Sequence, residues 1–179
     1  MSMESAFEVK IERSAPTKLY PFTKFFRGFD TVPAIRSLFG RQTGPVLRAL
    51  KVEFFGARFG YMGTSDIDGH LLISTNHLKN SEFRTVYLDV VHELCHVKQF
   101  RKGRPLFYPK LSYVDAPSEI EAYRFTVKEG LRIGMTNREL MDYLKVEWIS
   151  PAEHRRLARH CGLLGRSSRT RAHRKRLQK

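Results

Sequence analysis

The stretch that decides the fold is Thr85–Phe100, which reads TVYLDVVHELCHVKQF. It contains neither Pro nor Gly, and apolar side chains surround its polar residues, which predicts a long and buried helix. Lys102-Gly103-Arg104-Pro105 follows, and a Gly with a Pro shortly beyond it is a typical helix end. His92 and His96 lie four positions apart in this helix, so both imidazoles project from one face. We therefore expect the pair to bind one zinc ion.

Glu93 follows His92 and is turned from it by about 100° around the helix axis. At that angle it cannot easily bind the same ion, but its carboxylate can reach a water molecule bound to that ion. We therefore predict that Glu93 acts as a general base.

A catalytic zinc ion needs a third protein ligand and an open fourth position. A metzincin would carry Gly at position 99 and His at position 102, whereas this chain has Gln99 and Lys102, which excludes that class. His154 and His160 are downstream candidates, but their spacing of six on a short helix is more typical of a solvated basic face. A glutamate on a following helix is the remaining option.

Glu119 and Glu121 lie on such a helix, twenty-three and twenty-five positions after His96. Glu121 has Arg124 and Lys128 at helical spacing, which favours a surface ion pair. Glu119 has Ala122 and Tyr123 at the same spacings instead, so Glu119 is the preferred third ligand and Glu121 stays the rival.

His92–His96 together with Glu119–Ala122 resembles the gluzincins, the thermolysin-like clan of zinc metallopeptidases, here of a small intracellular type. In that clan the third ligand is a Glu followed at the third position by a small residue, which Ala122 matches. The sequence departs from the clan at Tyr123, where many relatives carry an Asp that orients a motif histidine. Asp89, Asp115 or a backbone carbonyl are the alternatives for that task.

The resemblance implies hydrolysis of peptide bonds in a protein or peptide substrate, with one zinc ion, a zinc-activated water and Glu93 as the base. It also implies an oxyanion partner, for which Tyr108, Tyr113 and His154 are candidates. In gluzincins an extended substrate adds to an edge strand. Gly69–Thr75 is either that strand or a plain core strand.

The predicted fold is α+β and zincin-like: a small antiparallel sheet packed on an active-site helix, with further C-terminal helices. We expect an irregular, aromatic-rich segment over residues 1–30, a metallopeptidase domain over 31–162 and a basic disordered tail over 163–179. Within the domain the pattern predicts short helices over 32–50, an antiparallel hairpin or meander over 51–75 and a polar loop over 76–81. Helices are expected from about 115 to 130, 137 to 146 and 151 to 161, the last two opened by capping boxes.

The formal net charge is +14, and residues 165–179 contribute seven Lys and Arg with no acid. Such a tail predicts non-specific contact with nucleic acid through phosphate groups. The last two helices resemble a crude helix-turn-helix, although a plain cap with a solvated outer face is favoured. A second hypothesis follows: a nucleic-acid-associated binding or regulatory protein on a zincin scaffold, with little or no hydrolytic activity.

Cys95 and Cys161 are the only cysteines, too few for a disulfide framework. Cys95 is expected to be a packing residue that points away from the zinc side. The N-terminus has no signal-peptide pattern, and no apolar run approaches the about 18 residues that a membrane helix needs. We therefore expect a cytoplasmic protein that has no membrane partner.

Overall fold

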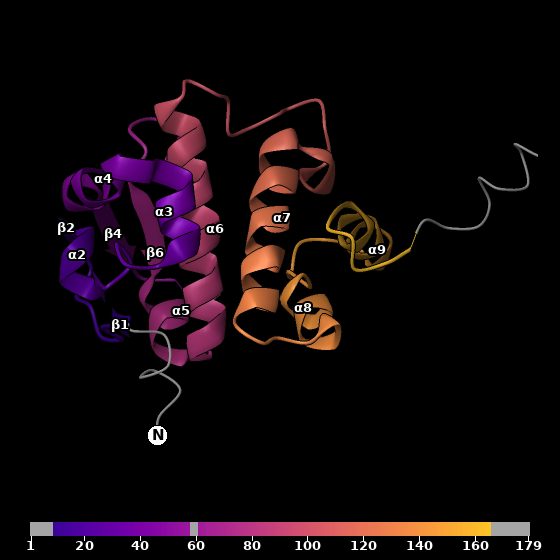
Figure 1. Ribbon diagram of the computed structural model, residues 1–179, viewed down its shortest axis with the longest axis horizontal. Helices are drawn as coiled ribbons and strands as arrows, with labels where there is room; N and C mark the ends of the chain where they lie inside the picture. Colours follow the sequence, from indigo (N-terminus) through magenta and orange to yellow (C-terminus); the bar gives the residue numbers. More distant parts are fainter. Residues whose placement is uncertain (1–8, 58–60, 166–179) are drawn as a thin grey trace, which may run out of the picture. The chain divides into compact units, whose positions relative to one another are not determined.

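The computed structural model describes residues 9–57 and 61–165 (Figure 1). The chain divides into two compact units, the first ending at Lys110 and the second beginning at Leu111. Most of the tail predicted to be disordered, residues 166–179, lies outside the described residues.

The first unit contains a four-stranded sheet in the order β2-β4-β6-β5. Its strands are β2 (Leu19–Pro21), β4 (Lys51–Phe55), β5 (Met62–Thr64) and β6 (Leu71–Ser74). The predicted antiparallel sheet is therefore wrong in one pairing, because β4 and β6 run parallel while the other two pairs are antiparallel. Alternate residues of β4 and β6 are fully buried and form the core face: Val52, Phe54, Leu71 and Ile73.

Strand β5 falls in a stretch rich in turn residues: Gly63 lies within it, and Gly60, Asp66, Asp68 and Gly69 lie around it. Gly63 occupies its centre and is buried. A Cβ at Gly63 would collide with the hydroxyl of Tyr61, so the glycine allows that ring to cross the strand. A strand that contains glycine for this reason carries no β-propensity signal.

Residues 9–30, which were expected to be irregular, form short elements instead. β1 (Lys10–Ile11) pairs with β3 (Phe26–Arg27), and α2 (Phe22–Phe25) lies between β2 and β3 in the sequence. The described phenylalanines of this segment are buried: Phe22, Phe25, Phe26 and Phe29. The predicted helices over 32–50 are confirmed as α3 (Pro33–Phe39), the short 3-10 helix η1 (Gly40–Gln42) and α4 (Thr43–Ala49).

The predicted polar loop over 76–81 is also wrong, because Thr75–Asn80 form helix α5. The side chain of Ser74 caps this helix by accepting a hydrogen bond from the backbone N–H of His77 at 3.1 Å. Leu78 is fully buried and anchors the helix to the core. Because Leu78 is the single apolar residue of this polar stretch, the sequence has no hydrophobic periodicity there from which a helix could be predicted.

The long helix is confirmed as α6 (Phe83–Arg101) and packs against α3 and β5. Almost every residue from Val86 to Val97 is buried, and Figure 1 shows α6 beside α3. Gly103 follows its end with a φ of 67°, the left-handed conformation expected of a glycine after a helix.

The second unit consists of η2 (Tyr113–Asp115), α7 (Pro117–Arg132), α8 (Asn137–Tyr143) and α9 (Pro151–His160). Pro117 occupies the first turn of α7, and both predicted capping boxes are present. Helices α8 and α9 pack against α7, and α9 also packs against η2. Across both described units, no helix combines the length and apolar character needed to cross a bilayer.

Candidate metal centre

Helix α6 brings the imidazoles of His92 and His96 together inside the first unit. Both side chains belong to residues that are only 5% exposed, and their Nε2 atoms lie 3.0 Å apart. Two nitrogens that bind one tetrahedral zinc ion, each at about 2.0–2.1 Å, would be separated by about 3.3 Å. The pair is therefore arranged to converge on a single ion.

Gln99 fixes the tautomer of His96. Its Oε1 lies 2.8 Å from His96 Nδ1, and because an amide oxygen can only accept, Nδ1 carries the proton. The Nε2 of a neutral His96 then presents a lone pair towards His92. Gln99 is fully buried and its amide nitrogen lies 3.9 Å from Cys95 Sγ, which supports this orientation of the amide.

Two buried imidazole nitrogens that face each other at 3.0 Å would repel one another through their lone pairs, so a proton or a metal cation must lie between them. Without an ion, a proton on His92 Nε2 would serve as the donor to His96. A divalent cation can replace that proton and satisfy both lone pairs at once. The donor set, two neutral imidazoles, is one that zinc commonly takes.

Glu93 lies beside the pair and is itself 5% exposed. One ligand atom from each of His92, Glu93 and His96 falls within 4.8 Å of the others, a spacing that could hold a metal ion. Glu93 Oε2 accepts a hydrogen bond from the hydroxyl of Thr64 at 2.8 Å. The same hydroxyl lies 3.2 Å from the backbone oxygen of Glu93, so strand β5 contacts the glutamate twice.

The sequence anticipated neither Gln99 nor Thr64 as neighbours of the site. Gln99 had a local signal, because it follows His96 by three positions on one helix face. Thr64 had none, since it reaches Glu93 through strand pairing from 29 residues away.

The two candidate third ligands, Glu119 and Glu121, belong to the second unit. Both are half-buried and lie on α7, Glu119 in its first turn. The described geometry within each unit does not choose between them, so Glu119 remains a prediction. Ala122, the small residue of the pattern, is fully buried.

Tyr123, which replaces the Asp of many gluzincins, is 4% exposed and bonds to another candidate residue. Its hydroxyl lies 2.8 Å from that of Tyr113. His154, proposed as an alternative oxyanion partner, uses its Nε2 to donate to the backbone oxygen of Met141 at 2.8 Å. Tyr108 is half-buried in the first unit.

The two aspartates considered as partners for a motif histidine make other contacts. Asp89 Oδ2 lies 2.7 Å from His77 Nε2. Asp115 binds Ser112, Arg156 and His160 within the second unit. The partner found for His96 is thus a glutamine of its own helix.

Gly69–Thr75 is not an edge strand, because β6 lies between β4 and β5. Its alternative, a core strand, is confirmed by the full burial of Leu71 and Ile73. The edge strand next to α6 is β5, which also carries Thr64. Cys95 is 1% exposed, as expected of a packing residue.

Helix α9 does not resemble a free recognition helix. Its apolar residues Leu157 and Ala158 are fully buried, and Arg156 and His160 are bonded to Asp115 of η2. This arrangement favours the packing role over the helix-turn-helix interpretation.

When the chain is compared with known proteins, no family model, no curated protein and no solved structure matches it.

Proposed function

We propose that the chain is a zinc-dependent metallopeptidase of the zincin type, with His92, His96 and Glu119 as ligands and Glu93 as general base. The observation that carries the proposal is the buried pair of imidazoles, whose Nε2 atoms lie 3.0 Å apart with the Glu93 carboxylate beside them. A purely structural zinc site has no use for a buried carboxylate next to the ligands.

When bound, the zinc ion would supply Lewis-acid chemistry, lowering the pKa of a water molecule and polarising a substrate carbonyl. The residues of the chain have separate tasks. Gln99 holds His96 in the tautomer whose Nε2 can act as a ligand. Thr64 binds Oε2 of Glu93 and orients its carboxylate, which would accept a proton and later pass it to the leaving amine.

Strand β5 supports a peptide substrate in this proposal. Within the described residues, β5 pairs with β6 on one side and has no strand neighbour on the other. An extended peptide can add to such an edge through backbone hydrogen bonds, which suits a protease that reads main chain. Thr64 on the same strand would place the bound peptide close to Glu93.

The test combines metal analysis with cleavage of an unfolded protein substrate. Wild-type protein should contain one zinc ion per chain, and Glu93→Gln should keep the zinc and lose cleavage. Glu119→Ala should lose zinc while Glu121→Ala keeps it. Full zinc in both variants would remove Glu119 from the ligand set, and a wild type without zinc would end the proposal.

The second hypothesis is the nucleic-acid-associated protein with little hydrolysis, and it is supported by the net charge of +14. It predicts that wild-type protein cleaves nothing and that removing the basic tail abolishes its function. We place either activity in a reducing, intracellular compartment, in keeping with the two free thiols, Cys95 and Cys161.

A further inference from the structure

The net positive charge of the described residues lies in the first unit. Residues 9–57 and 61–110 carry sixteen Lys and Arg against eight Asp and Glu, a net charge of +8. Residues 111–165 carry eight of each and are neutral. The basic tail is therefore not the sole source of the excess charge.

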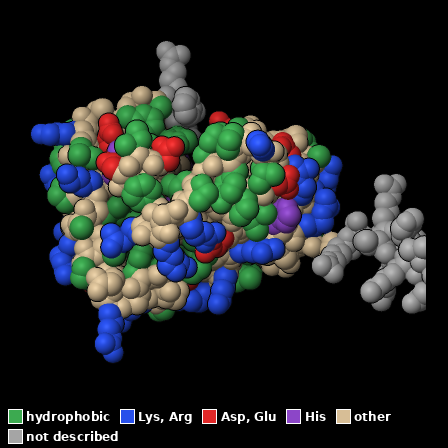
Figure 2. Space-filling model, turned by 90° about the horizontal axis from the view of Figure 1, so that it is seen from above, with side chains coloured by type: hydrophobic (Ala, Val, Ile, Leu, Met, Phe, Trp, Pro, Cys, Tyr) green, Lys and Arg blue, Asp and Glu red, His purple; other side chains and the backbone are tan. Residues whose placement is uncertain are grey.

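Within the first unit the excess is concentrated from Arg13 to Val52, which contains eight basic residues and one acid, Asp30. These residues include β2, α2, α3 and α4. Seven of the eight basic side chains are exposed: Lys18, Lys24, Arg27, Arg36, Arg41, Arg48 and Lys51. Lys and Arg side chains are widespread on the face seen in Figure 2, while acidic side chains form small groups.

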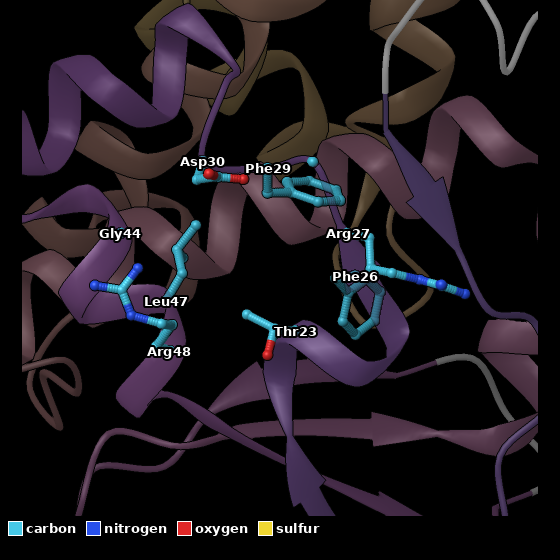
Figure 3. A pocket seen from close by; sticks show the side chains of 9 residues that line it. Thr23, Phe26, Arg27, Phe29, Asp30, Gly44, Leu47 and Arg48 are labelled. Atoms are coloured by element: carbon cyan, nitrogen blue, oxygen red, sulfur yellow. The ribbon is translucent and has the colours of Figure 1, made fainter.

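Helix α4 lies between two hollows, and four cationic residues line them. Arg27 and Arg48 line a pocket of about 210 Å³. Figure 3 shows their guanidinium groups on opposite sides of this pocket, both directed away from its centre. Lys51 and Arg101 line a second hollow, of about 270 Å³, against the other side of α4. We call these four residues the α4 basic surface.

The four cations have no carboxylate partner in the part of the chain that the structure describes. The acids that line the same hollows are Asp30, which is exposed, and Asp68, which lies 2.5 Å from His70. The bond from His70 lowers the pKa of Asp68, although burial opposes it. Unpaired like charges repel one another, so such a surface gains most from a partner that is itself a polyanion.

We propose that the α4 basic surface binds the phosphate backbone of nucleic acid without regard to sequence. Of the aromatic rings that line the two hollows, Phe26 and Phe29 are each 1% exposed and Phe100 is half-buried. These rings present little of their faces to solvent, so base stacking, the usual means of single-strand recognition, is disfavoured here. What remains exposed is guanidinium and ammonium groups, which pair with phosphate oxygens.

The test measures binding of the full chain to a labelled DNA duplex of random sequence by fluorescence anisotropy, over a range of salt concentrations. The first variant replaces Arg27, Arg48, Lys51 and Arg101 with Gln. The matched control replaces four exposed cations of the second unit, which also lack carboxylate partners within the described residues: Arg138, Lys145, Arg155 and Arg159. Both variants change the net charge equally, so they separate a specific surface from overall attraction.

The first variant should bind on the order of tenfold or more weakly, and its salt slope should fall by up to about 0.9 for each lost phosphate contact. The control should keep most of the affinity and slope. Equal losses in the two variants would overturn the proposal. So would full retention of binding by the first variant, with loss only when the cations of residues 166–179 are replaced. Tighter binding to phosphatidylcholine vesicles containing phosphatidylglycerol than to the duplex would also overturn it, because the surface would then serve a membrane.

Discussion

The hydroxyl of Thr64 donates a hydrogen bond to Oε2 of Glu93 at 2.8 Å, which joins edge strand β5 to helix α6. A hydroxyl has one hydrogen to donate, and its bond to a carboxylate is stronger than one to a neutral acceptor. The contact therefore fixes the rotamer of Glu93 and occupies one of its two oxygens. Glu93 therefore stays beside the histidine pair with one of its two carboxylate oxygens bound to Thr64.

Thr64→Val should lower kcat about tenfold with little change in KM, because a positioned base would lose the bond that orients it. Thr64→Ser should restore most of the activity, since it returns the hydroxyl. Zinc content should be unchanged in both variants. Thr17→Val, at an exposed position, serves as the control.

A binding measurement separates this prediction from the proposed activity. A hydroxamate inhibitor binds zinc and needs an oriented glutamate beside it, so its affinity should drop in Thr64→Val even if no protein substrate is known. Unaltered hydroxamate affinity would show that Thr64 does not position Glu93.

Gln99→Leu should weaken zinc binding by about 10–100-fold, because His96 Nδ1 would lose its acceptor and the ring its fixed tautomer. Gln99→Glu should retain the affinity, since a carboxylate accepts the same bond. Competition with a coloured chelator measures both. Gln42→Leu, at an exposed position, is the control, and a similar loss there would refute the orienting role of Gln99.

Asp115 should stabilise the second unit in a pH-dependent manner. Burial raises the pKa of Asp115, but the hydroxyl of Ser112, the His160 ring and the charge of Arg156 outweigh it and hold the pKa below its usual 3.8. A carboxyl with a lowered pKa in the folded state contributes stability above about pH 3.8 and loses it as the pH falls through the folded pKa.

Asp115→Asn should therefore reduce the free energy of unfolding at pH 7 by about 1 kcal/mol or less, because the pairs lie near the surface. The difference from wild type should shrink between about pH 5 and pH 3. Urea unfolding at several pH values measures this difference. Asp142→Asn, at an exposed position of α8, is the control. A difference that stays constant down to pH 3 would contradict the assignment.

Both thiols should be unreactive in the folded protein. Burial raises the pKa of Cys161 to about 12, against the opposing charge of Arg124, and Cys95 is 1% exposed. At pH 8 the thiolate fraction of Cys161 is then on the order of 10⁻⁴. Ellman's reagent should react slowly with the native protein. In urea it should react with two thiols per chain, and with one thiol per chain in the Cys161→Ser variant. Rapid reaction of Cys161 in native protein at pH 8 would contradict its raised pKa.

The sequence predicted what depends on local signals. Helix α6 followed from a run free of Gly and Pro, and the capping boxes at Thr136 and Ser150 were readable from four residues each. The spacing of His92 and His96 placed both imidazoles on one face because a helix repeats every 3.6 residues. The burial of Glu93 followed from the apolar residues around it.

The rest depends on contacts between distant segments. The parallel pairing of β4 with β6 and the position of β5 at the edge are properties of the folded sheet and leave no periodic trace in a glycine-rich stretch. The bond between Thr64 and Glu93 depends on that sheet, so the sequence could not predict it.

The burial of helix α6 has a consequence for the order in which the protein is assembled. The two histidines lie on one helix whose neighbouring valines and leucines are buried, and Gln99 orients His96, so contacts within the protein set the geometry of this pair. In a zinc finger the ion organises the chain, whereas here the chain organises the site. Under the proposed function, metal binding would therefore not be needed for folding, and a chelator should leave a folded apoprotein that can bind the ion again.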